Sequence, residues 1–399
     1  MTMSIYPAYR ESGIDIIDVL PSHWETSKVA RIAKAGYRTF IDGDWIESPY
    51  ITDRGIRLIQ TGNVGIGIFK EQGYRFISDE TFHLLKCTEV IPNNVLICRL
   101  AAPVGRACLA PKFDDRMITS VDVCILKVSD DWDARYVTYF FSSKPYLDLM
   151  GAVSRGGTRD RISRSFLGNV RIAKPTISEQ TKIADFLDRE TAEADALVAK
   201  YERLIELLEE KRIALITQAV TKGLDHKDLM KESGIEWMGD IPAHWEIRPL
   251  KHLFRFEKGK NAQRLTSKYI QDHPGRYPVY SGQTDNNGIM GLIDTFDYAV
   301  DEVLFSTTVG AKVMTPLTLR GEFSLSQNCL IGIPNKSSTC TDFFYYALHP
   351  LFSFHRASIP DHMQPSLRVA DIANFPVMFP SLTDQKKIAE CLKETDARN

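Results

Sequence analysis

Short glycine-bearing segments rich in arginine, amide and hydroxyl side chains are the parts of this sequence best suited to recognising another molecule. Amide and guanidinium groups pair with the edges of DNA bases, and cations beside them contact phosphates. The clearest such segment is the basic loop at residues 154–159. In the first half of the chain the candidate DNA-contacting residues are Gln60, Thr61, Asn63, Arg99, Arg106, Arg155, Thr158 and Arg159. Each could instead belong to an ordinary turn, and residues 158–161 to an internal ion-pair network.

The second half of the chain has polar segments of the same kind, with fewer arginines and more amides. The candidate DNA-contacting residues there are Tyr280, Ser281, Gln283, Asn286, Thr307, Thr308, Lys312, His362 and Gln364. As in the first half, an ordinary turn is the alternative for each residue taken alone.

Charge is balanced over the whole chain, with 49 Lys and Arg residues against 51 Asp and Glu and a net charge of −2. The global basic excess that is typical of proteins holding DNA alone is absent. Residues 154–174 and 250–270 nevertheless each carry six basic residues against one acidic residue. A basic run is often only a solvated face, but two of them beside glycine-rich segments favour phosphate contacts.

Sequence motifs for catalysis and metal binding are missing. The sequence has no G-x-x-x-x-G-K-[ST], H-E-x-x-H, G-x-S-x-G or Asn-Pro-Pro-Tyr segment and no Cys-x-x-Cys pair. His23 and His244 each lie two residues before a glutamate, Glu25 and Glu246, so a general base is conceivable. No nucleophile or metal-ligand set accompanies these pairs. We therefore expect no catalytic residue and no metal site, and a hydrolase that uses the His–Glu pairs stays as an alternative hypothesis.

The sequence contains an internal repeat with two separate markers. A marker, S-G-I-acid followed by P-x-H-W-E, occurs at residues 12–25 and again at 233–246, a constant offset of 221 residues. A second marker, P-x-x-x-x-Q-x-K-I-A, occurs at residues 175–184 and 380–389, an offset of 205 residues. Self-similarity at fixed offsets indicates a duplicated structural unit.

The repeat predicts two similar mixed α/β (α+β) domains, and 399 residues suit two or three domains. Short apolar runs such as Val95–Cys98, 121–128 and 303–305 are typical of strands, and 136–150 and 343–354 of short helices. The expected segments are an N-terminal segment 1–22, a first variable domain 23–175, a long helix 176–223, a linker 224–243, a second variable domain 244–380 and the start of a further helix 381–399.

Residues 179–222 contain no proline or glycine and predict one long helix, with Ser178 as its N-cap and Gly223 as its stop. Its apolar or small residues recur at coiled-coil-like spacing: Ile183, Leu187, Ala194, Leu197, Tyr201, Leu204, Leu208 and Leu215. A helix of this length is roughly 65 Å long and cannot bury such a seam alone. We expect a partner helix, and a plain domain linker is the alternative.

This order of segments resembles the DNA-specificity subunit of a type I restriction-modification system. The passage from A-V-T-K-G-L-D, at residues 219–225, to S-G-I-E-W-x-G-x-I-P-x-H-W, at residues 233–245, carries the resemblance most specifically. The resemblance covers nearly the whole chain. It implies that each variable domain is a target recognition domain that reads one half of a bipartite, asymmetric site in double-stranded DNA.

The resemblance also implies partners. Two methyltransferase subunits would dock on the helices and use S-adenosylmethionine, and a motor-nuclease subunit would use ATP and magnesium. The specificity subunit itself would hold no cofactor and catalyse nothing. A scaffold that binds only proteins through the long helix is the alternative function.

The second copy of the helix departs from the pattern, because few residues follow Gln385 where the first copy runs on to Lys222. We expect a truncated helix pair and self-association through the exposed seam. No apolar run reaches about 18 residues and no secretory signal is recognisable, so we expect a cytoplasmic protein without a membrane anchor.

Overall fold

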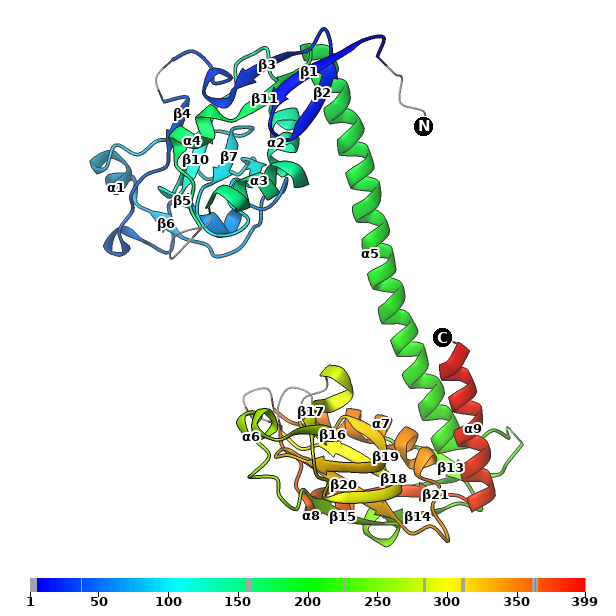
Figure 1. Ribbon diagram of the computed structural model, residues 1–399. Coiled ribbons are helices and arrows are strands. Elements are labelled where there is room, and N and C mark those ends of the chain that lie inside the picture. The colour runs from blue at the N-terminus through cyan, green and yellow to red at the C-terminus, as the bar shows by residue number, and fades with distance from the viewer. Residues whose placement is uncertain are drawn as a thin grey trace. The chain divides into compact units, whose positions relative to one another are not determined.

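The computed structural model describes residues 6–36, 38–154, 160–225, 227–282, 285–309, 313–360, 363 and 365–398. The chain divides into unit 1, up to Val198, and unit 2, from Ala199 onward, and the boundary lies within helix α5 (Ile177–Lys222) (Figure 1). Both units are mixed α/β, so the expected fold class is confirmed. Within the described residues, no helix is long and apolar enough to cross a membrane.

Unit 1 is built mainly of short strands with four short helices. Its elements are β1 (Tyr9–Ile14), β2 (Ile17–Pro21), β3 (Glu25–Lys28), η1 (Val29–Arg31), β4 (Phe40–Asp42), η2 (Ser48–Tyr50), β5 (Ile56–Ile59), η3 (Thr61–Asn63), β6 (Phe76–Ile77), α1 (Asp79–Leu84), β7 (Val95–Cys98), β8 (Ala107–Leu109), β9 (Met117–Thr119), β10 (Val123–Leu126), α2 (Ala134–Ser142), α3 (Lys144–Ser154), α4 (Arg164–Asn169) and β11 (Arg171–Lys174).

Two sheets form the interior of unit 1. One has the strand order β4-β10-β7-β8 and the other the order β6-β5-β9. The strands β7 and β10 are buried throughout, as the apolar runs at 95–98 and 121–128 predict. Helices α2 and α3 cover the first sheet with buried aromatic residues such as Phe141 and Tyr146.

Unit 2 contains one large sheet and longer strands. Its elements are β12 (Met230–Glu232), β13 (Asp240–Pro242), β14 (Glu246–Pro249), η4 (Leu250–His252), β15 (Phe254–Lys258), α6 (Ser267–Asp272), β16 (Pro274–Tyr280), η5 (Asp285–Gly288), β17 (Ile289–Ile293), β18 (Tyr298–Thr307), β19 (Pro316–Leu325), β20 (Cys329–Pro334), α7 (Thr341–Ala357), α8 (Val369–Asn374), β21 (Pro376–Phe379) and α9 (Leu382–Arg398).

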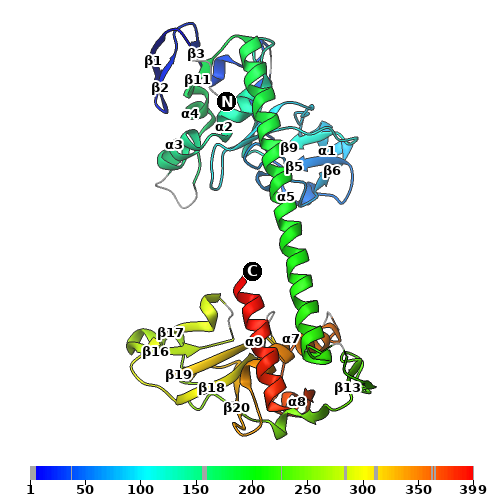
Figure 2. The same cartoon turned by 90° about the vertical axis from the view of Figure 1, so that its right-hand side faces the viewer.

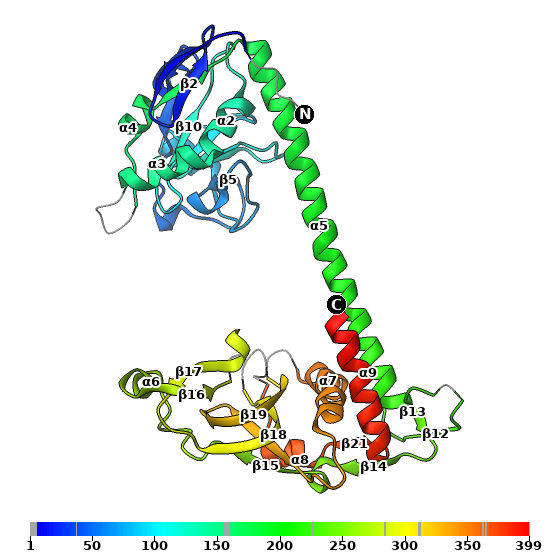
Figure 3. The same cartoon turned by 45° about the vertical axis from the view of Figure 1, so that its right-hand side comes forward.

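The large sheet of unit 2 has the order β15-β20-β18-β19-β16-β17, and α7 packs on β18 and β19 (Figure 2). The main core of unit 2 joins α7 to both α5 and α9. Phe343 of α7 is buried with Ile216 and Val220 of α5 and with Ile388 and Leu392 of α9. In all three views α9 lies beside the last turns of α5 (Figure 3).

The elements at the start and at the end of each variable domain recur at the offsets of the sequence repeats. Strand β3, turn η1, helix α4 and strand β11 of unit 1 correspond residue by residue to β14, η4, α8 and β21 of unit 2. We call these elements the frame. The pairing of Arg171 with Lys28 between β11 and β3 has its counterpart in the pairing of Pro376 with Pro249. The four-stranded sheet β4-β10-β7-β8 of unit 1 has the same strand order as the part β15-β20-β18-β19 of the unit 2 sheet, with strands matched in chain order. The two units therefore have related topologies.

Helix α5 is continuous over 46 residues, as predicted, but it begins before the expected N-cap. Thr176 and Glu179 exchange hydrogen bonds: the Thr176 N–H donates to Glu179 Oε2 at 2.9 Å, and the Glu179 N–H donates to Thr176 Oγ1 at 3.4 Å. This reciprocal cap makes Thr176 the N-cap in place of Ser178. The end at Gly223, with φ +75°, is confirmed. Between the two ends, residues 193–211 are exposed throughout.

The helical run at 136–150 is two helices. Helix α2 ends at Ser142 and α3 begins at Lys144, with Ser143 extended at ψ 139°. Pro145 has no N–H to donate to the preceding turn, so it cannot continue α2, whereas the first turn of a new helix tolerates it. The run at 343–354 lies within the single helix α7.

Candidate nucleic-acid interface

The polar loop after β5 in unit 1 is held closed by its own amide groups. Asn63 is 7% exposed; its Oδ1 accepts from the Gln60 N–H at 2.8 Å, and its Nδ2 donates to the carbonyls of Lys70 and Gln72 at 3.0 and 2.7 Å. Gln60 and Thr61 are partly exposed on this loop. The amide of Asn63 is therefore used to shape the loop, and Gln60 and Thr61 are better placed to meet a ligand.

Arg99 and Arg106 also bind within the protein. Arg99 is 5% exposed, donates to the carbonyls of Ile162 and Val121 and pairs with Asp42 at 3.0 Å. Arg106 donates to four carbonyls at 2.6–2.9 Å, those of Thr61, Val64, Ala101 and Pro103. Both guanidinium groups thus hold loops together, and this placement does not support the expected phosphate contacts, which stay untested predictions.

Internal hydrogen bonds of unit 1 join the segments at 61–64 and 101–103 to Asp160. Arg106 joins the loop at 61–64 to the loop at 101–103, and the Ala101 N–H donates to the Asp160 carbonyl at 3.0 Å, directly after residues 155–159. Arg161, with a side chain 53% exposed, pairs with Asp122 at 2.8 Å at the same place. Three segments that are far apart in sequence are therefore joined by hydrogen bonds.

In unit 2 the structure forms a polar groove with a volume of about 700 Å³. Four cations line it, namely Lys258, Lys260, Arg264 and Arg368, and no acidic residue is among the described residues that line it. Amide side chains lie beside the cations: Asn261, Gln263, Gln327 and Asn328. We call this the basic groove. It combines donors for phosphates with amides that can pair with base edges.

Segments far apart in sequence close the basic groove. Thr308, 4% exposed, donates its N–H to the Asn328 carbonyl and accepts from the Leu367 N–H, both at 2.8 Å. The Ser326 N–H donates to the Tyr280 carbonyl at 2.8 Å. Lys260 donates to the Asp297 carbonyl at 3.1 Å, which holds its chain against the ring of Tyr298. Residues 258–264 of the basic run thus meet the segments 308–309, 326–329 and 366–368 in one place.

Several predicted residues of unit 2 are internal. Thr307 is fully buried, and its Oγ1 accepts from the Thr315 N–H at 3.1 Å. Ser281 is 7% exposed, and Tyr280 packs against Phe305 and Phe323. Asn286, in contrast, is exposed with φ +51°. Seven predicted residues lie outside the described residues and stay predictions: Arg155, Thr158, Arg159, Gln283, Lys312, His362 and Gln364.

The histidines of the repeated marker do not pair with the nearby glutamates considered from sequence. His23 Nε2 lies 2.9 Å from Glu179 Oε1, and Trp24 Nε1 donates to the same oxygen at 3.2 Å. Trp245, the counterpart of Trp24, is 2% exposed in the core of unit 2. These contacts fix the start of α5 on unit 1, so a His23–Glu25 general base has no support in the geometry.

A buried glutamine fixes each long helix to its unit in the same way. Gln180 Oε1 accepts from the Asp133 N–H at 3.0 Å, and its Nε2 donates to the carbonyls of Asp131 and Pro175. Gln385 Oε1 accepts from the Cys340 N–H at 2.8 Å, and its Nε2 donates to the carbonyls of Ser338 and Pro380. Both side chains are fully buried.

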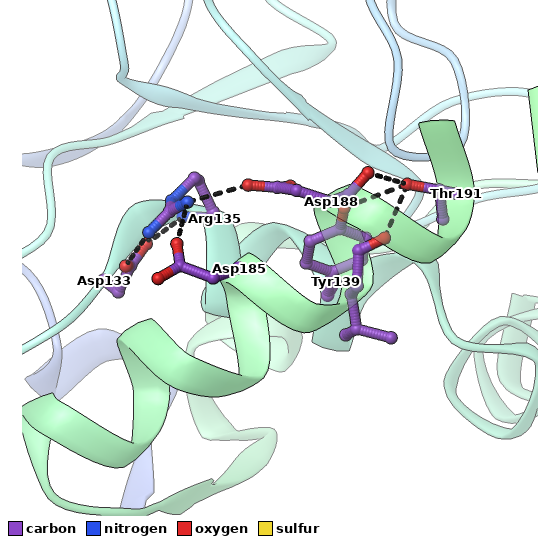
Figure 4. A network of polar contacts seen from close by, with 7 residues as sticks. Asp133, Arg135, Tyr139, Asp185, Asp188 and Thr191 are labelled. Carbon is purple, nitrogen blue, oxygen red and sulfur yellow. Dashed lines mark hydrogen bonds and ion pairs between the residues drawn. The ribbon is translucent and has the colours of Figure 1, made fainter. Parts of the chain in front are cut away.

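In unit 1 an ionic network reinforces this attachment (Figure 4). Arg135 of α2 contacts Asp185 and Asp188 of α5 through Nη1, each at 2.7 Å, and Asp133 through Nη2 at 2.9 Å. Tyr139 Oη donates to Asp188 Oδ1 at 2.7 Å. The first turns of α5 are therefore a fixed part of unit 1.

Comparison with known proteins identifies the family. The family model described as type I restriction modification DNA specificity domain matches residues 22–207 and 242–399, once over each unit. The chain belongs to this family. Its match over both units confirms the resemblance that the repeated markers carry.

Individual relatives are similar over part of the chain. A putative type I specificity subunit of Mycoplasma pneumoniae is 34% identical over 168 residues, which are 41% of this chain and 52% of the relative. The specificity subunit of the type I restriction enzyme MpnII, from the same organism, is 32% identical over 168 residues, or 48% of its length. The chain thus spans about half the length of these relatives.

A solved structure confirms the fold at low sequence identity. It comes from work on complex assembly and conformational transition of the type I R-M system. It aligns with a TM-score of 0.63 at 14% identity, covering 95% of this chain and 91% of the other.

Proposed function

We propose that this chain is the DNA sequence-recognition subunit of a type I restriction-modification complex. Each unit reads one half of a bipartite, asymmetric site in double-stranded DNA, and the chain itself catalyses nothing. The observation that carries the proposal is the double match of the specificity-domain family, once on each unit. The basic groove of unit 2 supports it, because lysine, arginine and amide side chains lie together there. Two of these groups also bind carboxylates, since Arg368 pairs with Asp371 and Asn261 donates to Asp297.

The catalytic partners of such a complex are separate chains. We assign S-adenosylmethionine to methyltransferase subunits, and ATP and magnesium to a motor-nuclease subunit; this sequence has neither the Asn-Pro-Pro-Tyr segment nor the G-x-x-x-x-G-K-[ST] segment. The exposed apolar side chains of α5 are the surface we assign to partner subunits: Leu197, Val198, Tyr201, Leu204, Ile205, Leu207 and Leu208. Apolar patches that stay exposed on a single chain mark interaction sites.

Selection from random duplex DNA tests the recognition function. The chain is purified with its methyltransferase subunit, and bound duplexes are recovered and sequenced. We expect a split consensus with a spacer of fixed length. Recovery without any consensus, while the chain still binds its partner, would favour the alternative of a protein scaffold.

A second experiment separates partner binding from self-association. Leu204→Glu places a charge in the exposed seam of α5, where it alters no buried core. We expect this variant to lose the methyltransferase subunit on co-purification while its circular dichroism stays unchanged. Light scattering of the isolated chain then tells whether the same surface also joins two copies; a monomer at micromolar concentration contradicts the expected self-association.

A further inference from the structure

The two units carry similar helix-to-helix junctions in which one ion pair has its charges exchanged. The buried Gln180 and Gln385 define the alignment, because each accepts from the backbone N–H that directly precedes α2 or α7. Counted from these points, Arg135 of α2 corresponds to Asp342 of α7. Asp188 of α5 likewise corresponds to Lys393 of α9.

In unit 1 the cation is on the recognition domain and the anions are on the long helix. Arg135 Nη1 lies 2.7 Å from both Asp185 Oδ1 and Asp188 Oδ2. In unit 2 the signs of the two charges are reversed, since the anion Asp342 on the domain pairs with the cation Lys393 on the helix. Asp342 also lies 3.9 Å from Arg320.

The tyrosine beside each ion pair keeps its place. Tyr139 Oη donates to Asp188 of α5 at 2.7 Å, and its counterpart Tyr346 donates to Asp396 of α9 at 3.0 Å. The junctions thus share their buried glutamine and their tyrosine, which makes the two helices similar docking surfaces. They are opposite in charge at one position, Asp188 of α5 and Lys393 of α9, and alike at another, Asp185 and Glu390.

Crossed pairings would bring like charges together. With α7 packed on the first turns of α5, Asp342 would face both Asp185 and Asp188. With α2 packed on α9, Arg135 would face Lys393, although Glu390 stands at the position that corresponds to Asp185. The first crossing places one carboxylate beside two others, whereas the second places Arg135 beside one cation and one carboxylate. The first crossing is therefore opposed more strongly, because each like-charge contact costs about as much as a matched ion pair contributes.

We propose that this charge reversal selects which helix start each recognition domain packs on. It favours α2 on the first turns of α5 and α7 on α9, and it opposes domain exchange with a second copy of the chain. Duplicated modules need such a device, because similar surfaces otherwise pair in more than one way. The proposal rests on the repeat and is independent of DNA binding.

Charge variants of α9 in the full chain test the ion-pair part of the proposal. Lys393→Asp gives α9 the charge that α5 carries at this place, and we expect the thermal midpoint of unit 2 to fall by about 3 °C at low salt. The loss should shrink in 1 M NaCl, where charges are screened beyond about 3 Å. Adding Asp342→Lys restores opposite charges between α7 and α9 and should recover part of the midpoint, since the new lysine also lies near Arg320. Lys386→Asp, an exposed position of the same helix, is the matched control.

Exchanging both helix charges tests the choice of partner. The double variant Asp188→Lys with Lys393→Asp favours the crossed pairing, so light scattering should show more dimer than for the wild-type chain at equal concentration. The proposal is overturned if Lys393→Asp behaves like Lys386→Asp, if Asp342→Lys fails to rescue it, or if the exchanged chain has the same mass distribution as wild type.

Discussion

Arg212 of α5 and Asp396 of α9 are joined by two parallel hydrogen bonds, Nε to Oδ1 and Nη2 to Oδ2, each 2.8 Å long. Tyr346 of α7 donates to the same carboxylate at 3.0 Å. One carboxylate therefore connects three helices of unit 2. The Arg212 guanidinium holds the pKa of Asp396 below its usual range, so the pair stays ionised at neutral pH.

Loss of this pair should weaken unit 2. Because both side chains are about one-third exposed, water screens the interaction, and we expect Arg212→Met to lower the free energy of unfolding by about 1 kcal/mol. Urea denaturation measures the loss. Arg203→Met is the control, since Arg203 pairs with Glu206 on an exposed face of the same helix. Equal effects of the two variants would contradict a linking role for Arg212.

Acid should destabilise unit 1 through Glu179. Burial alone raises the pKa of this carboxyl, but hydrogen bonds from His23, Thr176 and Trp24 outweigh it and lower the pKa to about 2. A carboxyl with a depressed pKa contributes stability above its unfolded value, about 4.3, and loses it as the pH falls toward 2. We expect Glu179→Gln to be less stable at pH 7 and to lose less stability between pH 4.5 and 2. Parallel pH profiles of the two chains would contradict this assignment.

The buried glutamines should be among the most sensitive positions of the chain. Leucine in place of Gln180 leaves the Asp133 N–H and two carbonyls without their partner, and each buried unsatisfied group costs about 1–3 kcal/mol. We expect Gln180→Leu to destabilise unit 1 by at least about 2 kcal/mol and Gln385→Leu to do the same to unit 2. Gln218→Leu, on an exposed face of α5, should change little. Hydrogen exchange assigns each loss to its unit.

The basic groove should account for part of the salt dependence of DNA binding. Each phosphate contact contributes about 0.9 to the slope of log affinity against log salt, so Lys258→Ala with Arg264→Ala should lower the slope by up to about 2. Fluorescence anisotropy from 50 to 200 mM salt, with the selected duplex and the methyltransferase subunit, measures it. Lys336→Ala, beyond the other end of β20, is the control. An unchanged slope in the double variant would remove the groove from the interface.

Sequence patterns predicted the repeated architecture well because repeats and periodicity are local signals. The offsets of the two markers coincide with the frame elements, and the proline-free run from 179 to 222 coincides with α5. The single helix expected at 136–150 was wrong, since a new helix begins at Lys144. Pro145 lacks the N–H that would continue α2, and this signal is present in the sequence.

The candidate interface could be predicted only in part, because side-chain burial depends on contacts between distant segments. Arg99 and Asn63 are residue types that are common in ligand-binding loops, but both side chains are buried and form hydrogen bonds within the protein. Gln327 and Asn328 were missed, although they lie in the basic groove beside cations that the run at 250–270 had indicated. Only the folded chain brings the turn between β19 and β20 next to that run.

The frame has an evolutionary consequence. Its elements correspond residue by residue in the two units, whereas the strands between them differ in number, length and sheet arrangement. Insertions, deletions and recombination within the interior can therefore accumulate while the attachment to the helix is kept. A lineage can acquire new target sites in this way without re-evolving the rest of the molecule.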